Sequence, residues 1–130
     1  MLCSSLKTIT IPSSVKIIGK YAFSKCTQLI QVNFENPSSV EIISDYAFNQ
    51  CSKLEKIIFP SSVKSIGNNV FENCVSLKQV TLCNTIDYFG TDIFKGIKTL
   101  EIKGGIQHIP KELFLECSSL TQITIPSSVT

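Results

Sequence analysis

The chain has 130 residues, 43% of them hydrophobic and 17% charged, which predicts a folded domain and excludes a disordered chain. Twelve Lys, no Arg and ten acidic residues leave a net charge of +2 with both signs scattered, so no basic stripe for nucleic acid is expected. No apolar run approaches the roughly 20 residues of a membrane helix, and the start does not resemble a signal peptide, so we expect no membrane insertion by this segment.

The sequence consists of repeats. Residues 3–16 (CSSLKTITIPSSVK) return at 117–130 (CSSLTQITIPSSVT) with eleven of fourteen positions identical, and weaker copies lie between them. Such self-similarity is typical of proteins in which each copy forms one coil of a stack. We therefore expect a single domain, 1–130, whose units are 3–25, 26–50, 51–73, 74–95 and 96–116, followed by a partial unit 117–130.

The first half of each unit contains a stretch that is typical of a short strand. In the first unit, Ile9 and Ile11 alternate with threonines, and Pro12 ends the stretch because proline cannot donate to a sheet ladder. One coil cannot cover its own apolar side, so we expect the copies to stack and their strands to pair in parallel. The first strand column of the alignment is Ile9, Val32, Ile57, Val80, Leu100 and Ile123.

The second half of each unit carries a recurring Ala-Phe pair followed by Cys. The stretch 46–51 (YAFNQC) favours a helical turn that places Ala47, Phe48 and Cys51 inside the coil. The second unit is longer than the others because Glu35 and Asn36 are inserted before its turn.

The pattern L-x-x-I-x-I-P-S-S-V-x-x-I-G-x-x-A-F-x-x-C resembles the leucine-rich repeat of the BspA type, also called the Treponema pallidum type, over essentially the whole chain. The chain departs from it at Cys83, at 103–105, where Pro-Ser-Ser is expected, and in the fifth unit, which lacks the Cys segment and places Ile97 in the leucine column. The resemblance implies an α/β repeat fold. It is a right-handed leucine-rich-repeat solenoid with one parallel β-sheet on the concave face, and with short helical or 3-10 turns and extended segments elsewhere.

Five of the six cysteines fall in one column. They are Cys3, Cys26, Cys51, Cys74 and Cys117, and Cys83 stands outside it. A cysteine at the same place in each coil is expected if it serves there as a small buried hydrophobic residue. We therefore expect free buried thiols, with disulfides between neighbouring coils as the alternative. The chain has no C-x-x-C motif and a single His, which argues against a zinc site.

The sequence indicates no catalytic, cofactor-binding or metal site. His108 lies in a mixed column that predicts an exposed ring, and Glu112 is the only acid near it in sequence. The pair Gly104-Gly105 is not followed by the Lys and Ser or Thr of a phosphate-binding loop. We therefore expect a protein that is not an enzyme.

The outward side of the strands is the candidate binding face. Its polar residues offer hydrogen bonds at modest desolvation cost, and Ile58 is a candidate apolar anchor. The alternative is that these residues are simply good strand formers that face water. The candidates are Thr8, Thr10, Gln31, Asn33, Lys56, Ile58, Gln79, Thr81, Thr99, Glu101, Gln122 and Thr124.

Two functions are compatible with these features. The resemblance implies a recognition module of a surface-exposed, adhesin-like protein that binds a host or matrix protein. The absence of a signal peptide and the expected free thiols favour an intracellular interaction scaffold, which would be cytoplasmic. The chain starts inside one unit and stops inside another without polar caps, which suggests a longer array or end-to-end self-association. In either case the partner is another protein of unknown identity.

Overall fold

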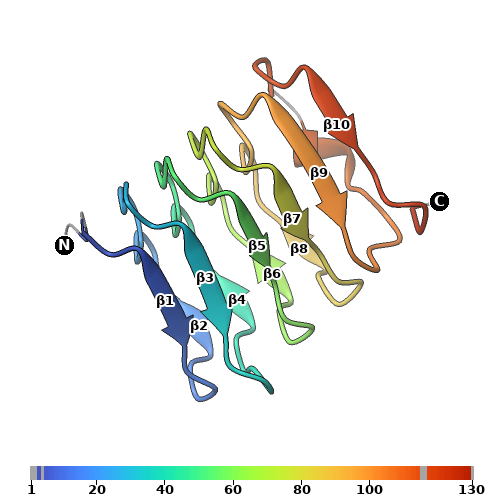
Figure 1. The fold of residues 1–130 in the computed structure, drawn as a ribbon. Helices are drawn as coiled ribbons and strands as arrows, with labels where there is room; N and C mark the ends of the chain where they lie inside the picture. The colour runs from blue at the N-terminus through green and yellow to red at the C-terminus, as the bar shows by residue number, and fades with distance from the viewer. Residues whose placement is uncertain (1–2, 4, 115–116, 130) are drawn as a thin grey trace.

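In the computed structural model, which describes residues 3, 5–114 and 117–129, the chain winds into coils that stack along one axis (Figure 1). The two termini lie at opposite ends of the stack. The ends of the units 96–116 and 117–130 fall partly outside the described residues. Apolar residues of successive coils form one continuous core, which confirms that the repeats share a single interior.

The long strands lie side by side on one face of the stack, and every pairing is parallel, as predicted. Strands β1 and β3 form a two-stranded sheet, and β5, β7, β9 and β10 form a four-stranded sheet in that order. The strands are β1 (Thr8–Ile11), β3 (Gln31–Phe34), β5 (Lys56–Ile58), β7 (Gln79–Thr81), β9 (Thr99–Lys103) and β10 (Gln122–Thr124).

A separate parallel sheet, which we call the second sheet, lies behind the two sheets of long strands, so the prediction of one sheet is wrong. It consists of two-residue strands that follow each turn: β2 (Ile17–Ile18), β4 (Ile42–Ile43), β6 (Ser65–Ile66) and β8 (Tyr88–Phe89). In β2 and β4 the second residue is buried while the first faces solvent. Coils of nearly equal length stack in register, which brings these short segments within pairing distance even though each is too short to be recognised from alternation.

The helical or 3-10 turns predicted around the Ala-Phe pairs are found in the fifth unit but not in the earlier ones. The described residues contain one helical segment, the 3-10 helix η1 (Lys111–Phe114), and the earlier corners are successive turns. The N–H of Ala22 donates to the Gly19 carbonyl at 3.1 Å, whereas that of Phe23 donates to Ala47 of the next coil at 2.8 Å. A helix uses its N–H groups within itself, so it cannot share alternate ones with a neighbouring coil.

Left-handed residues make these corners possible. They flank the corner phenylalanines at fixed spacing and have φ between 56° and 87°: Tyr21, Lys25, Tyr46, Gln50, Asn69, Asn73, Asp92 and Gly96. The left-handed region favours Gly, Asn and Asp, which occupy the last four of these positions. The phenylalanines between them, Phe23, Phe48, Phe71 and Phe94, form a stack that Phe114 continues, with ring centroids 5.4 to 6.0 Å apart.

The fifth coil shows that part of the column alignment is wrong. Val80 pairs with Ile102 and not with Leu100, although Leu100 does pair with Ile123 as predicted. Ile97 donates its N–H to the Phe94 carbonyl at 3.2 Å, as Cys74 does to Phe71 at 3.1 Å. Ile97 therefore takes the place of the cysteine, and β9 uses its five residues to pair at two registers.

Candidate functional site

The candidate binding residues all lie on the outward side of the long strands, which we call the strand face. They alternate with buried residues such as Val32, Ile57 and Val80, which point into the core. Ile58 is 61% exposed and is the large apolar side chain of this set. Exposed members are Thr8, Thr10, Gln31, Asn33, Lys56, Ile58, Thr99, Gln122 and Thr124; Gln79, Thr81 and Glu101 are half-buried.

Strand register brings most of these residues together in rows. The expected neighbours that pair are Thr8 with Gln31, Thr10 with Asn33, Lys56 with Gln79, Ile58 with Thr81, Thr99 with Gln122 and Glu101 with Thr124. The expected pairs Gln79–Thr99 and Thr81–Glu101 do not form.

Glu101 takes the place next to Gln79 because of the register of β9. The Gln79 Nε2 donates to Glu101 Oε1 at 3.0 Å. Lys103 lies opposite Thr81 and joins the strand face, a residue that the sequence reasoning missed. The signal was the alternation of Thr99–Lys103, which continues for five residues and not for three.

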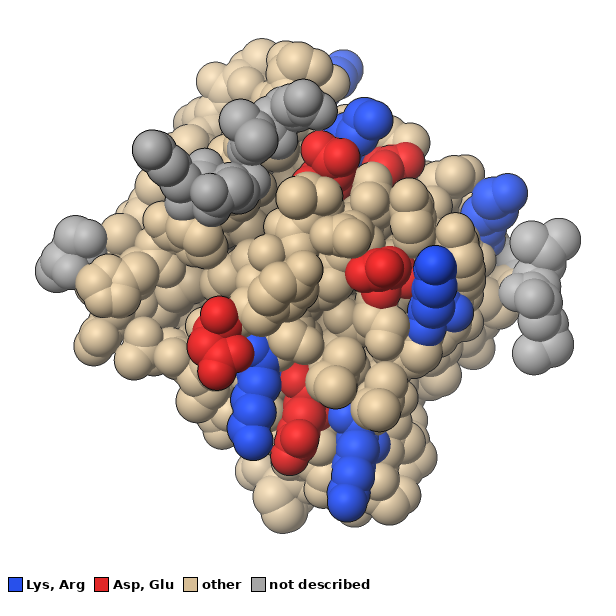
Figure 2. Space-filling view, turned by 180° about the vertical axis from the view of Figure 1, so that it is seen from behind, with Lys and Arg blue, Asp and Glu red and all other residues tan. Residues whose placement is uncertain are grey.

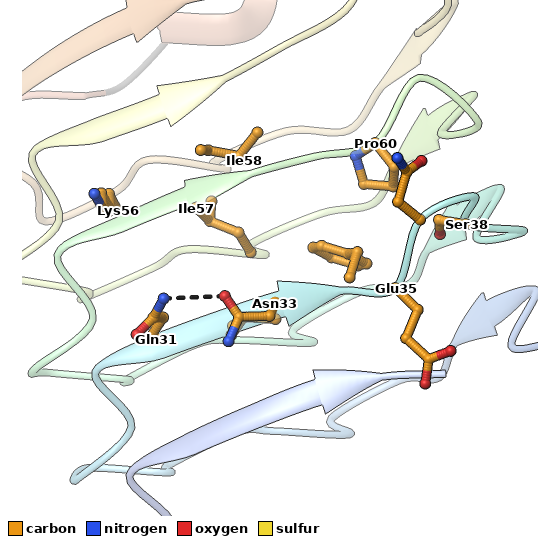
Figure 3. Close-up of a pocket in the computed structure, with 11 residues that line it drawn as sticks. Gln31, Asn33, Glu35, Ser38, Lys56, Ile57, Ile58 and Pro60 are labelled. Carbon is orange, nitrogen blue, oxygen red and sulfur yellow. Dashed lines mark hydrogen bonds between the residues drawn. The ribbon is translucent and has the colours of Figure 1, made fainter. Parts of the chain in front are cut away.

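The strand face is interrupted between β3 and β5, which lie next to each other without pairing. The interruption is a cavity of about 320 Å³, which we call the β3–β5 slot (Figure 3). It coincides with the unit that carries the insertion Glu35–Asn36, and both inserted residues line it. The other lining residues are Gln31, Val32, Asn33, Phe34, Ser38, Lys56, Ile57, Ile58 and Pro60.

The slot combines apolar walls with a polar edge. Phe34 and Pro60 are half-buried along it, and Ile58 stands outward on the β5 side. On the β3 side, Gln31 Nε2 donates to Asn33 Oδ1 at 3.0 Å (Figure 3). The Lys56 side chain lies at the end near Gln31. Such an arrangement accommodates an apolar group between carbon surfaces and offers amide hydrogen bonds beside it.

The opposite face, built on the second sheet, has a different character. Ile17 and Tyr88 are 55% and 56% exposed there, separated by Ile42 and Ser65 of the strands between them. Figure 2 views this side of the molecule and shows lysines interleaved with acidic residues. Lys64 Nζ and Glu41 Oε1 are 3.8 Å apart in an exposed ion pair. No patch of a single charge forms on the face shown.

The cysteine column is partly oxidised. Cys3 and Cys26 form a disulfide with their Cα atoms 5.0 Å apart, so the expectation of free thiols is wrong for this pair. Among the described residues, Cys51, Cys74, Cys83 and Cys117 are free. Burial raises the pKa of the Cys74 thiol well above its ordinary value, and hydrogen bonding to Cys51 adds to this. Burial, followed by the charge of Asp92, raises the pKa of Cys117.

The residues considered for chemistry are not brought together. His108 is exposed, as predicted, in the loop before η1, and the side chain of Glu112 lies outside what the structure describes. Gly104 has a φ of 101° and serves a turn. Across the described residues, no three His, Cys, Asp or Glu side chains cluster in a way that would hold a metal ion. No helix in the same part of the chain combines the length and apolarity needed to cross a membrane.

The sequence matches the family model of the BspA type leucine rich repeat region, with six copies over residues 1–101 and 42–130. No similar sequence was found among curated proteins.

Solved structures of leucine-rich-repeat proteins share the fold. The Treponema pallidum leucine-rich-repeat protein is 32% identical with a TM-score of 0.76, and the match covers 94% of this chain and 57% of that protein. The pneumococcal vaccine antigen PcpA is 26% identical with a TM-score of 0.62, covering 95% of this chain and 40% of PcpA. A leucine-rich-repeat protein from Bacteroides ovatus, 24% identical with a TM-score of 0.54, shares the fold over 95% of this chain and 44% of its own length. This chain therefore spans only about half the length of the proteins it is similar to.

Proposed function

Because the chain belongs to the family of BspA-type leucine-rich repeats, we propose that it is a protein-recognition module, not an enzyme, whose strand face binds an extended segment of another protein. The observation that carries this proposal is the β3–β5 slot in the middle of rows of outward polar side chains. Leucine-rich repeats generally mediate contacts between proteins, which supports the same function.

An extended segment suits the strand face for geometric reasons. Hydrogen-bonding residues recur at the spacing of parallel strands, about 4.8 Å, across the whole stack. A partner laid across the strands meets Thr10 and Asn33 on one side of the slot and Thr81 on the other. One apolar side chain of the partner enters the slot against Phe34 and Ile58, and the slot sets the register of binding.

Two settings for this module follow from different observations. The likeness to PcpA, which is named as a vaccine antigen, supports a part of a surface-exposed, adhesin-like protein that binds a host or matrix protein. Four free cysteines support an intracellular interaction scaffold, because thiols persist best in reducing compartments. Thiol titration of unfolded, unreduced protein from its native source separates the two: six free thiols favour the intracellular setting, and disulfides favour the surface. End-to-end association and the identity of the partner stay predictions.

The test uses two isoleucines that differ mainly in the face they occupy. Purified matrix proteins and a random-peptide display library are screened against the full chain, and the best ligand is measured by titration calorimetry. We expect Ile58→Ser to weaken its binding about tenfold or more, which is about 1.4 kcal/mol. The matched control is Ile17→Ser on the second sheet, because Ile17 is 55% and Ile58 61% exposed.

Both substitutions are at the surface, so their effect on stability is expected to stay within about 0.5 kcal/mol. Circular dichroism verifies that both variants fold. An equal loss of binding affinity in the two variants, or a loss of affinity only in Ile17→Ser, would show that the strand face is not the binding surface.

A further inference from the structure

Another cavity, which we call the corner cavity, lies over the corners of the first three coils. Its volume is about 440 Å³, and it shares no lining residue with the β3–β5 slot. A ligand bound there is therefore distinct from the extended segment proposed for the strand face. The residues that line the corner cavity are Tyr21, Ser24, Lys25, Tyr46, Asn49, Gln50 and Glu72.

Four of these lining residues have a left-handed backbone, with φ between 60° and 62°. They are Tyr21, Lys25, Tyr46 and Gln50, whose side chains make this conformation energetically unfavourable. The third and fourth coils build the same corner with residues that tolerate it, and these are Asn69, Asn73, Asp92 and Gly96. The corner itself thus needs only Asn, Asp or Gly, so the larger side chains of the first two coils indicate a role beyond the fold.

The two tyrosines form the apolar wall of the corner cavity. Their rings stack with centroids 4.9 Å apart and planes inclined by 15°, and Lys20 Nζ lies 5.6 Å from the centroid of the Tyr21 ring. On the other side of Tyr46, the equivalent residue of the next coil is the smaller Asn69. The row of rings ends there, so no further aromatic residue of the described chain stacks on that face of Tyr46. Such a face attracts the partly positive C–H groups of a sugar ring, because an aromatic face is partly negative.

Polar groups stand beside this aromatic wall. Asn49 is only 5% exposed, and its Oδ1 accepts the hydroxyl of Ser24. The Nδ2 of Asn49 donates to no other described residue, which leaves it for a ligand. Glu72 accepts the Asn69 amide through Oε2, so its Oε1 is available as an acceptor. Amides and a carboxylate together supply the donors and acceptors that neighbouring sugar hydroxyls require.

Charge and size narrow the class of ligand. Lys25 and Glu72 contribute one charge of each sign, and the other lining residues are neutral, so the formal charge of the lining is zero. A phosphorylated or sulfated ligand needs several cationic donors that converge on it, and this lining has a single lysine. The volume of about 440 Å³ falls in the range of small-molecule sites, roughly 300–1,000 Å³.

We propose that the corner cavity binds a neutral saccharide of one or two hexose units. One sugar ring packs its C–H face against Tyr46, and its hydroxyl groups bond to Asn49, Gln50 and Glu72. The saccharide is the end of a glycan on a glycoprotein or a unit of a glucan, since both present the same neutral, hydroxyl-rich ring.

Saturation-transfer difference NMR of the full chain with four neutral disaccharides tests the proposal. Lactose and mannobiose represent the ends of glycoprotein glycans, and maltose and cellobiose represent glucans. We expect at least one pair to bind with a Kd in the millimolar range, and the pair that binds identifies the source. A sulfated heparin disaccharide is expected to bind more weakly than the neutral ligand.

Tyrosine fluorescence gives an independent measure of binding. The chain has three tyrosines and no Trp, and two of the three line the corner cavity. Titration with the disaccharide that binds best is therefore expected to change the tyrosine emission, with the same Kd that NMR gives.

Substitutions to Asn separate binding from folding. In Tyr21→Asn and Tyr46→Asn the new side chain tolerates the left-handed backbone, as Asn69 does in the third coil. We expect both variants to fold, as circular dichroism verifies, and to bind the saccharide about fivefold or more weakly. The matched control is Tyr88→Asn on the second sheet, because Tyr88 is 56% and Tyr21 52% exposed. It is expected to keep the affinity of the wild-type chain.

The test is independent of the one for the strand face. Ile58→Ser is expected to keep its saccharide affinity, since Ile58 lines the slot and not the corner cavity. Any of three results would overturn the proposal: no binding of the four neutral disaccharides, tighter binding of the heparin disaccharide, or unchanged affinity in both Tyr21→Asn and Tyr46→Asn.

Discussion

At Gly67 the neighbouring coil leaves no room for a Cβ atom. Asp45 of the preceding coil accepts the N–H of Asn68 through its Oδ1 at 2.8 Å, which draws the two coils together at this point. A Cβ on Gly67 would lie 2.8 Å from the Asp45 backbone nitrogen and 3.0 Å from the Ser44 carbonyl carbon. Backbone atoms cannot rotate away as a side chain can, so the position admits only glycine.

We therefore expect Gly67→Ala to lower the free energy of unfolding by about 1–3 kcal/mol through overpacking. Gly19 occupies the corresponding place in the first coil, and a Cβ there meets nothing within 4 Å. The control Gly19→Ala is expected to change the stability by less than about 0.5 kcal/mol. Urea unfolding followed by circular dichroism measures both, and equal values for the two variants would contradict the close approach of the coils.

The left-handed corner residues show what sequence reasoning can miss at the same scale. Asn69, Asn73, Asp92 and Gly96 are residues that tolerate a positive φ, and their spacing of four within each corner is visible in the sequence. In the first two coils, Tyr21 and Lys25 or Tyr46 and Gln50 occupy these positions, and their side chains give no such indication. The sequence of the first two corners therefore predicts a helical turn, and only the Asn, Asp and Gly residues of the later corners indicate left-handed positions.

Among the structural elements, the stack of corner phenylalanines joins the coils most directly. Phe71 is fully buried and its ring stacks on Phe48 and on Phe94, with centroids 5.9 Å away on both sides. Among the residues that the structure describes, Phe23 stacks on Phe48 alone, and it is half-buried. A phenylalanine in the middle of the stack thus supports two coil interfaces, and one near its end supports a single interface.

Phe71→Ala is expected to destabilise the fold by about 3–5 kcal/mol, since it removes a buried ring and leaves a cavity. Phe23→Ala is expected to destabilise the fold clearly less, because solvent and neighbouring side chains fill part of the space that the ring leaves. Thermal unfolding monitored by circular dichroism compares the two variants. A loss of stability in Phe23→Ala as large as that in Phe71→Ala would mean that the central phenylalanines do not support more coil interfaces than the terminal one.

At the scale of the whole molecule, each coil contacts only its neighbours. Within the described part of the chain, strand β1 pairs with β3 alone and β10 with β9 alone, whereas β7 pairs with both β5 and β9. In such a stack the stability is approximately a sum over neighbouring interfaces, so the terminal coils are held by half as many contacts as the central ones.

Native-state hydrogen exchange is expected to reflect this arrangement. Backbone amides of β7 should exchange slowest, and those of β1 and β10 at least about tenfold faster, because terminal coils open without disrupting the centre. Exchange followed by mass spectrometry of peptides from each coil measures the gradient. Uniform protection along the stack would show that the coils unfold only together.

The sequence by itself determined the repeat, the parallel stacking and the outward side of the long strands. These follow from the period of two in stretches such as Thr8–Ile11 and from the need of every coil to bury its apolar columns against a neighbour. It did not determine the second sheet, the corners, the Cys3–Cys26 disulfide, the register of β9 or the β3–β5 slot. Those features depend on how the backbone of one coil contacts that of the next. They are decided by which N–H donates to which carbonyl, and by how the register of the strands changes where a residue is inserted or missing. The candidate residues could be named from alternation alone, but the slot that interrupts them lies where β3 and β5 adjoin without pairing, which only the tertiary structure shows.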